Sequence, residues 1–310
     1  MRALVTGASG CLGRALVEQL ALHGWGVGTT ARQAVALPGF RAADLAHAAL
    51  APLVAGIDVV FHCAARSSAW GTRDEFHAAN VLATRRLLDA AERAGVKRFV
   101  LASSPSIYAD GTDRLDLAED APLPARPLSL YAESKRIAER MVLDHAGAMA
   151  CTAIRPRAIY GRHDRALLPR VILAMRQGRV PMIRGGQALI DLTHRHDAAR
   201  GMILAASGPR GGVWNITSGE AFRFRELAAM IARESGLRLR GLPLPYALAR
   251  WLAGASEAVA RARGGAEPRL TRQAVASLGS SLTLDISAAR RELGYRPQVG
   301  FRQGVAECFA

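Results

Sequence analysis

Residues 6–13 read TGASGCLG, and this stretch decides how the rest of the chain is interpreted. It follows a strand-like run and opens a helical pattern over residues 12–23, the context that a phosphate-binding turn requires. Gly7 permits a tight bend, Gly10 lets the backbone approach a pyrophosphate, and Gly13 lets the helix pack closely on the strand. An ordinary strand-to-helix turn is the alternative, but we predict a dinucleotide-binding loop. The predicted contacts come from Gly7, Ser9, Gly10, Cys11, Leu12 and Gly13.

Short apolar runs rich in β-branched residues alternate with helical patterns in the first half of the chain. This alternation is typical of repeated strand–helix–strand units and predicts an α/β, doubly wound parallel sheet of the Rossmann type. Gly24 and Gly95 follow the first two helical patterns, where helix C-caps are expected. The expected strands cover residues 3–6, 26–30, 58–63, 98–103 and 150–155, and the expected helices cover residues 12–23, 74–94 and 131–145.

From about residue 159 onward, glycine and proline become frequent and the regular alternation fails. A strand over residues 213–216 and helices over residues 198–206 and 226–234 remain recognisable. We therefore expect two parts. The first is an NAD(P)-binding Rossmann domain at residues 1–158, and the second is a smaller substrate-binding lobe at residues 159–310, some of whose strands and helices return to the first domain.

The composition narrows the class of protein. A chain of 310 residues, half of them hydrophobic, can bury a substantial core. No apolar run reaches membrane-spanning length and the N-terminus lacks a secretory pattern, so we expect a cytoplasmic protein without an integral membrane segment. The net charge of +15 comes from arginines spread along the chain, without a nucleic-acid-binding signature, so nucleic acid is not an expected partner. Scattered cysteines without a CxxC pair predict reduced thiols.

The residue after the second expected strand bears on the choice of cofactor. An acid about 20 residues after the glycines is typical of NAD enzymes, whereas an arginine there suits the 2′-phosphate of NADP. The chain has Arg32 at this place and no acid between Glu18 and Asp44. We therefore expect NADP. NAD is the alternative, in which case Arg32 is an ordinary surface arginine.

Tyr131 and Lys135 lie four residues apart in YAESK, on one face of an expected helix. An ammonium beside a phenol favours the phenolate and should lower the tyrosine pKa, so the pair can exchange a proton with a substrate hydroxyl or carbonyl. Of 41 Lys and Arg residues only Lys97 and Lys135 are lysines, which favours a site that needs a compact ammonium. A chance pair on an amphipathic helix is the alternative.

A hydroxyl that orients the substrate oxygen is expected at the end of the strand over residues 98–103, because ligands bind at the carboxyl edge of a parallel sheet. Ser103, Ser104 and Ser106 all lie there. Spacing alone does not choose among them, and a serine at such a position is often a turn former.

Several stretches together resemble the extended short-chain dehydrogenase/reductase superfamily, over nearly the whole chain. They are TGASGCLG, ADL at 43–45, VFHCAA at 60–65, NVLAT at 80–84, SSPSIY at 103–108, YAESK at 131–135 and RPRAIYG at 155–161. The resemblance implies an oxidoreductase in which Ser104, Tyr131 and Lys135 are catalytic while a nicotinamide carries the hydride. It assigns Asp44 and Leu45 to the adenine, and Lys135 also to the nicotinamide ribose. The remaining cofactor positions are Ala64, Ala65, Arg66 and Pro156, with Cys11 standing where an aromatic residue is usual.

Within this superfamily the chain is most similar to the 3β-hydroxysteroid dehydrogenase branch, which includes bacterial 2-alkyl-3-oxoalkanoate reductases. The similar stretches are AWG at 69–71, SSPSI at 103–107, LIDLTH at 189–194, PRLTR at 268–272 and ELGYRP at 292–297. Ala158 and Ile190 stand where the rival nucleotide-sugar enzymes carry residues for the diphosphate. Arg157, Arg184 or Arg195 could compensate. The resemblance implies an apolar substrate, steroid-like or acyl-chain-like, contacted by Trp70, Ser104, Arg157, Ala158 and Ile190.

Two other functions stay open at this point. One is 4-epimerisation of a nucleotide sugar, and the other is a non-catalytic dinucleotide sensor, which would have no need of Tyr131, Lys135 and Ser104 together. The superfamily commonly dimerises through the helices that match residues 74–94 and 131–145, so the resemblance implies a homodimer.

Two further stretches need an interpretation. HRHD at 194–197 superficially suggests a metal cluster, but we expect Asp197 to cap a helix that starts at Ala198 while the histidines pack nearby, and we expect no metal. Residues 242–252 are amphipathic. They are predicted as lid or core, with peripheral contact with anionic lipid as the alternative.

Overall fold

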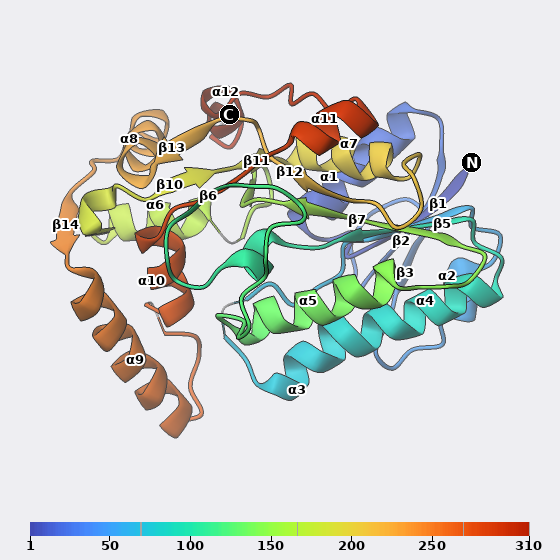
Figure 1. The fold of residues 1–310 in the computed structure, drawn as a ribbon, viewed down its shortest axis with the longest axis horizontal. Coiled ribbons are helices and arrows are strands. Elements are labelled where there is room, and N and C mark those ends of the chain that lie inside the picture. The colour runs from blue at the N-terminus through green and yellow to red at the C-terminus, as the bar shows by residue number, and fades with distance from the viewer. Residues whose placement is uncertain (69, 166, 269, 310) are drawn as a thin grey trace.

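A seven-stranded parallel sheet forms the centre of the computed structural model, which describes every residue except 69, 166, 269 and 310 (Figure 1). The strand order is β12–β7–β5–β4–β1–β2–β3, and every neighbouring pair is parallel. The strands are β1 (Arg2–Thr6), β2 (Gly26–Ala31), β3 (Phe40–Ala42), β4 (Val59–His62), β5 (Arg98–Ala102), β7 (Ala150–Pro156) and β12 (Val213–Ile216). The predicted doubly wound sheet is confirmed, with each expected strand in place. The stretches AWG and PRLTR include residues 69 and 269, which lie outside the described residues.

Helices cover both faces of this sheet, which is why its central strands are buried almost throughout. α1 (Cys11–Leu22) and α7 (Arg195–Ala205) pack on one face, and α4 (Ala83–Arg93) and α5 (Leu130–Leu143) pack on the other (Figure 1). A short helix, α2 (Ala51–Val54), packs beside α4. The two apolar layers hold the carboxyl ends of the strands together at one edge.

The single helix expected over residues 74–94 has three parts. α3 (Arg73–Phe76) leads into a π-helical turn, η1 (His77–Leu82), and then into α4. A π-helical turn accommodates one extra residue, and such turns are frequent at functional sites. Here the hydroxyl of Thr84 donates to the Asn80 carbonyl oxygen at 2.6 Å, a side-chain bond to the backbone inside the helix. The wider turn carries the buried Asn80.

The smaller lobe is built on a four-stranded sheet of order β13–β10–β15–β6. Its strands are β13 (Ala221–Arg223), β10 (Leu189–Asp191), β15 (Leu282–Leu284) and β6 (Arg114–Leu117). α6 (Leu168–Arg176), α8 (Phe224–Ser235) and α12 (Phe301–Ala306) enclose its apolar core. Two short parallel pairs complete it, β8 (Ile159–Tyr160) with β11 (Thr193–His194) and β9 (Val180–Ile183) with β14 (Gly241–Leu244). The expected smaller lobe is therefore present.

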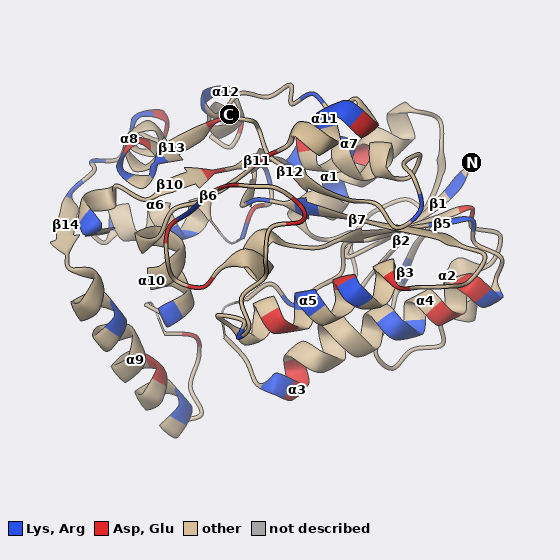
Figure 2. Ribbon diagram, viewed as in Figure 1, with Lys and Arg blue, Asp and Glu red and all other residues tan. Residues whose placement is uncertain are grey.

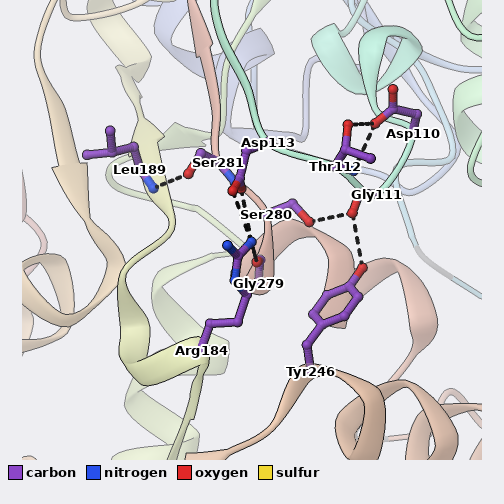
Figure 3. Close-up of polar contacts among 10 residues, drawn as sticks. All are labelled: Asp110, Gly111, Thr112, Asp113, Arg184, Leu189, Tyr246, Gly279, Ser280 and Ser281. Atoms are coloured by element: carbon purple, nitrogen blue, oxygen red, sulfur yellow. Dashed lines mark hydrogen bonds and ion pairs between the residues drawn. The ribbon is translucent and has the colours of Figure 1, made fainter.

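The two halves of the chain interleave. β12 and α7 come from the second half but belong to the large sheet and its covering layer, whereas β6 comes from the first half and joins the lobe. The segment before β6 is also tied to the lobe by side chains (Figure 3). Asp113 Oδ1 accepts from the Ser281 backbone nitrogen at 2.6 Å, and Arg184 Nη1 donates to Asp113 Oδ2 at 3.0 Å. The Tyr246 hydroxyl donates to the Gly111 carbonyl oxygen at 3.3 Å.

Two expectations need correction. Asp197 does not cap a helix, because α7 begins at Arg195 and Asp197 accepts instead from the backbone nitrogens of Gln298 and Val299 at 2.9 and 3.1 Å. Residues 242–252 are core only in part. Ala249 is buried, but the stretch divides between β14 and the start of α9 (Tyr246–Ala262), where several large apolar side chains are exposed. Among the described helices, none combines the length and apolar character needed to cross a membrane.

Candidate active site

The glycine loop approaches its neighbours too closely for larger residues. A Cβ at Gly13 would lie 2.4 Å from the Gly7 carbonyl oxygen. Gly7 has a φ of +65°, and a Cβ there would lie 2.6 Å from the Ala64 backbone nitrogen. Gly10 caps α1 without a side chain, and the first turn of α1 carries no acid. A tight backbone cradle at a helix start without negative charge fits a pyrophosphate.

Three loops meet at one edge of the sheet because the strands before them are in register. Thr6 at the end of β1 pairs with His62 at the end of β4, and His62 pairs with Leu101 of β5. The glycine loop, residues 63–66 and residues 103–104 therefore leave the sheet side by side at its carboxyl edge. This is the edge at which ligands bind in open parallel sheets.

A directed chain of hydrogen bonds runs through His62 beneath these loops. The Ala64 N–H donates to Thr6 Oγ1 at 3.2 Å, and Thr6 Oγ1 lies 2.7 Å from His62 Nδ1. On the other side, His62 Nε2 lies 3.0 Å from Thr84 Oγ1, whose proton goes to the Asn80 carbonyl. His62 therefore donates from Nε2 and accepts at Nδ1, and this network assigns a neutral imidazole. Burial, which lowers the pKa of His62 to about 3, favours the same form.

The three predicted catalytic residues come together at this edge. Tyr131 and Lys135 lie one turn apart in α5. Lys135 is buried, and its Nζ donates to the Ala102 carbonyl oxygen at the end of β5 at 2.6 Å. Ser104 follows two residues after Ala102, and its hydroxyl lies close enough to the Tyr131 phenol to favour the phenolate. The hydroxyl of Ser104 also accepts from the Ser106 backbone nitrogen at 3.2 Å, at the start of the short helix η2 (Pro105–Tyr108).

The pKa of Tyr131 moves against the expected direction. Burial raises the pKa of the phenol, and the neighbouring Ser104 hydroxyl works in the opposite sense. The expectation that this pKa is lowered is wrong for this structure: burial decides the direction, and the Lys135 ammonium donates to the backbone of Ala102 and not to the phenol. Burial lowers the pKa of Lys135 itself to about 8, while the nearby Glu139 carboxylate raises it. Lys135 therefore stays mostly charged at neutral pH.

Asn80 is a site residue to which the sequence analysis gave no role. Its Oδ1 accepts from the Arg66 backbone nitrogen at 2.7 Å, and its Nδ2 donates to Ser134 Oγ at 2.9 Å. Ser134 donates in turn to the Tyr131 carbonyl oxygen at 2.9 Å. Asn80 thus joins the loop after β4 to the first turn of α5. The signal in the sequence was the stretch NVLAT, which Asn80 opens.

Residues predicted for the ribose and adenine lie at the ends of β2 and β3. Arg32 is exposed directly after β2, which pairs with β1, so it lies at the same edge as the glycine loop. Asp44 is also exposed, and its Oδ1 accepts from the Ala46 backbone nitrogen at 3.0 Å, as in an Asx turn. The side chain of Leu45 differs, since it is buried in the core beneath α4.

The other predicted cofactor residues divide between surface and core. Leu12 is buried in the core under α1. Cys11 opens α1, and its Sγ donates to the Arg162 carbonyl oxygen at 3.4 Å, which ties the glycine loop to the lobe. Arg66 donates from Nη2 to the Trp70 carbonyl oxygen at 3.0 Å. Ser9 and Ala64 are half-buried, Ala65 is exposed, and Pro156 is buried at the end of β7.

The loop that carries Trp70 is fastened to the lobe. The Trp70 Nε1 donates to the Gly265 carbonyl oxygen at 3.3 Å. In the same loop, the Ser68 hydroxyl donates to Glu267 Oε2 at 3.1 Å. The other oxygen of Glu267 accepts from Arg170 of α6 at 2.8 Å. Trp70 therefore lies between the large sheet and the lobe, where we predict substrate.

Arg157, Ala158 and Ile190 occupy different environments. Ala158 has a φ of +42°, a left-handed value that few non-glycine residues adopt. The Arg157 Nε lies 3.6 Å from Asp191 Oδ1, and both side chains are largely buried. Burial raises the pKa of Asp191 to about 6 although Arg157 opposes this. Ile190 is buried within the apolar core of the lobe. Arg157 and Ala158 follow β7 directly, at the carboxyl edge of the large sheet.

Residues 3–217 match the NAD dependent epimerase/dehydratase family. A 4-hydroxy-2-methyl-3-oxo-4-farnesyl-3,4-dihydroquinoline-1-oxide ketoreductase of Stigmatella aurantiaca is 37% identical, over 98% of this chain and 95% of its own. A 2-alkyl-3-oxoalkanoate reductase of Stenotrophomonas maltophilia is 33% identical, over 98% of this chain and 97% of its own. These matches confirm the resemblance drawn from the sequence.

A solved structure, MoeE5 in complex with UDP-glucuronic acid and NAD, aligns with a TM-score of 0.78 and 31% identity. The alignment covers 99% of this chain and 97% of that chain. The ligand of MoeE5 is a nucleotide sugar, whereas the names of the two sequence relatives describe 3-oxo compounds. The backbone alone therefore does not separate the two substrate classes.

The neutral state of His62 predicts a specific loss of stability in acid. The unfolded chain protonates this histidine near its ordinary pKa of about 6.5, whereas the folded chain resists until about 3, so the unfolded state binds more protons in that window. Stability should therefore fall as pH decreases below about 6.5. His62→Gln cannot take the proton. It should cost about 1–3 kcal/mol at neutral pH through weakened hydrogen bonds, but it should show a shallower acid dependence.

Thermal unfolding midpoints of both proteins between about pH 4 and about pH 8 measure this difference. The other titrating groups act equally in the two proteins, so the native chain is its own control. Parallel curves for the two proteins would contradict the assignment of a neutral His62.

Proposed function

Because the chain belongs to the NAD dependent epimerase/dehydratase family of enzymes, within the extended short-chain dehydrogenase/reductase superfamily, we propose that it interconverts a ketone and a secondary alcohol. The proposed substrate is apolar, a β-keto or β-hydroxy compound, and the proposed location is the cytoplasm. The observation that carries this proposal is the meeting of Tyr131, Ser104 and the buried Lys135 beside the glycine loop.

The bound nicotinamide would supply the hydride for reduction of the carbonyl carbon and would receive it in oxidation. In reduction, the hydroxyls of Ser104 and Tyr131 hold the carbonyl oxygen, and Tyr131 donates its proton to that oxygen. Burial keeps Tyr131 protonated before reaction, which suits a proton donor. The charge of Lys135 stabilises the phenolate that forms, from a distance of one helical turn.

The partners of three arginines support an apolar substrate over a nucleotide sugar. Each arginine that could replace the missing diphosphate contacts already lies beside a carboxylate. Arg157 lies 3.6 Å from Asp191, Arg184 3.0 Å from Asp113 and Arg195 2.9 Å from Glu18. A diphosphate would have to compete with these carboxylates for the guanidinium groups. Ala158 and Ile190 offer no side-chain donor in their place.

The substrate class is tested by turnover of 3-oxo substrates of increasing apolar size, beside UDP-glucose and UDP-galactose. We expect kcat/KM to rise with chain length or ring count, because apolar burial contributes roughly 25 cal/mol per Å². The sugar nucleotides should give no turnover. Efficient turnover of the sugars, with no response to apolar size, would establish the epimerase alternative. Cofactor binding without turnover of any substrate would favour the sensor.

For the cofactor, we propose NADP, because Arg32 is exposed at the ribose end and the residues between Glu18 and Asp44 include no acid. Arg32→Ala should lose the preference for NADPH over NADH by about tenfold, the worth of one charge-assisted contact. Titration calorimetry of both cofactors on both proteins measures it. Arg41→Ala, which removes another exposed arginine nearby, is the control. Equal affinities in the unchanged enzyme would rule out this role for Arg32.

The proton relay predicts a pH profile. The Lys135 ammonium is lost above a pKa of about 8, so kcat/KM for reduction should fall as pH rises through that value. In Lys135→Arg the guanidinium keeps its charge, but it is too bulky to act as a compact point charge, so the variant should lose most turnover. Its remaining activity should not fall near pH 8, because the guanidinium stays protonated there. Tyr131→Phe should lose at least about 100-fold, because it removes the transferable proton.

Activity from about pH 6 to about pH 10 measures these profiles. Thermal unfolding midpoints like that of the native chain check that the variants stay folded. Near-full activity in either variant, or an unchanged profile in Lys135→Arg, would show that the relay is assigned to the wrong residues.

We also propose a homodimer that pairs through α3, η1, α4 and α5. α4 and α5 lie side by side on one face of the sheet (Figure 1). Ile137 of α5 is exposed there, beside a hollow lined by Phe76, His77, Val81 and Leu130. Ile137→Glu should therefore halve the mass measured by sedimentation. If the native protein already sediments with the mass of a monomer, the dimer is ruled out.

A further inference from the structure

Helix α9 has two apolar faces, and only one of them is covered. Ala249 and Ala253 are fully buried and pack on Val275 of α10 (Arg272–Gly279) and on Ile183. On the other face, large side chains are exposed, with Trp251 at 68% and Val259 at 50%. The exposed apolar residues are Ala247, Leu248, Trp251, Leu252, Ala255, Ala258, Val259 and Ala262. Their spacing of three or four residues aligns them in one stripe along the helix.

The charges around this stripe are all positive. Arg250 and Arg261 flank it on one side by helical spacing, and Arg263 follows it at the C-terminal end. Glu257 is the one acid in α9, and it points inward, with 8% exposed and Oε1 accepting from the Arg272 backbone nitrogen at 2.8 Å. Figure 2 shows the basic residues along α9 where it extends from the body of the molecule.

This pattern has the chemistry of a helix that lies in a lipid interface. Such helices place an apolar stripe into the boundary between headgroups and acyl chains, with basic residues at its edges and often a tryptophan. Arginine side chains can bury their stems on apolar surface while the guanidinium reaches anionic headgroups. The net charge of the whole chain, +15, has the same sign as the edge of the stripe.

A second copy of this chain is a poorer occupant of the stripe. Pairing two identical stripes would bring Arg250, Arg261 and Arg263 of one chain toward the same residues of the other. Glu257 compensates Arg261, whose Nη2 lies 3.8 Å from its Oε2, but the exposed face of α9 carries no acid for Arg250 and Arg263. Like charges across such an interface disfavour association.

We propose that the outer face of α9 docks this enzyme on the surface of an anionic lipid bilayer. The docked helix also lies beside Trp70, a predicted substrate contact. The guanidinium of Arg261 lies 5.1 Å from the ring centroid of Trp70, and Trp70 donates to Gly265 just beyond the end of α9. An apolar molecule dissolved in the bilayer would then meet the Trp70 loop without crossing water. The docking itself does not depend on what the enzyme reduces.

The test is co-sedimentation of the full chain with vesicles of equal parts phosphatidylglycerol and phosphatidylcholine, and with vesicles of phosphatidylcholine alone. We expect binding to the anionic vesicles, weakened by salt, and little binding to the neutral ones. Trp251→Glu with Val259→Glu should abolish it. Arg250→Gln with Arg263→Gln should lower the partition coefficient roughly 25-fold, since each arginine near such a surface contributes about fivefold.

Matched controls carry the same changes elsewhere on the surface. Leu22→Glu alters a leucine of α1 that is 86% exposed, and Arg93→Gln removes an exposed arginine of α4. Both should bind vesicles like the native chain. All variants should keep the native unfolding midpoint and the native affinity for cofactor, which separates docking from folding and from the proposed reaction.

Several results would overturn the proposal. They are failure of the native chain to bind anionic vesicles, equal binding to neutral vesicles, and native binding by the Trp251 and Val259 variant. A fourth is a halved mass of that variant in lipid-free solution, which would mean that the stripe is buried between two copies of the chain.

Discussion

The close passage of the backbone at Gly7 past the backbone at Ala64 is the contact on which the rest of the site depends. No side chain fits between them, since even a Cβ at Gly7 would lie 2.6 Å from the Ala64 nitrogen. Because β1 and β4 are adjacent and parallel, this contact places the glycine loop against the loop that leads to Trp70. The same loop is then held by Asn80, which also reaches the first turn of α5. A single approach of two main chains thereby sets the relative position of cofactor loop, catalytic helix and substrate loop.

Electrostatic balance around Lys135 explains how a buried ammonium is tolerated. Its Nζ donates a hydrogen bond to the Ala102 carbonyl oxygen, and Glu139, four residues further along the chain, supplies negative charge nearby. Glu139 is itself neutralised by Arg155, which donates to it from Nε at 2.9 Å and from Nη2 at 2.6 Å. Arg155 continues to the Tyr108 hydroxyl. Buried charges of alternating sign, each with hydrogen bonds, cost far less than an isolated one.

The large sheet could be predicted from the sequence because its signals are local. Continuous apolar runs mark buried parallel strands, and glycine at the places of Gly24 and Gly95 ends the helices between them. The stretch YAESK predicted that Tyr131 and Lys135 share a face, and the strand order brought Ser104 to them. These predictions depend on short-range sequence patterns, or on the rule that the carboxyl ends of parallel strands lie at the same edge of a sheet.

What the sequence did not predict depends on distant partners. The π-helical turn at residues 77–82 looks like ordinary helix in the sequence, because the bonds that hold Asn80 come from Arg66 and Ser134. Asp197 was taken for a cap because the groups that donate to it, the backbone nitrogens of residues 298 and 299, lie about a hundred residues away. The direction of the Tyr131 pKa was missed for a related reason, since spacing cannot tell how deeply the folded chain buries the phenol.

The interleaving of the two halves has a consequence for synthesis on the ribosome. When residue 158 has been made, β7 still lacks β12 along its outer edge, and α1 lacks the cover of α7. The backbone hydrogen-bonding groups at the edge of β7 are then unpaired, and apolar side chains of α1 are exposed. A chain in this state is prone to associate wrongly with other segments or other chains. The nascent large domain closes only after residue 216 emerges, and the small sheet only after β15 at residues 282–284. Neither part therefore reaches its final form until well after residue 158 has been made.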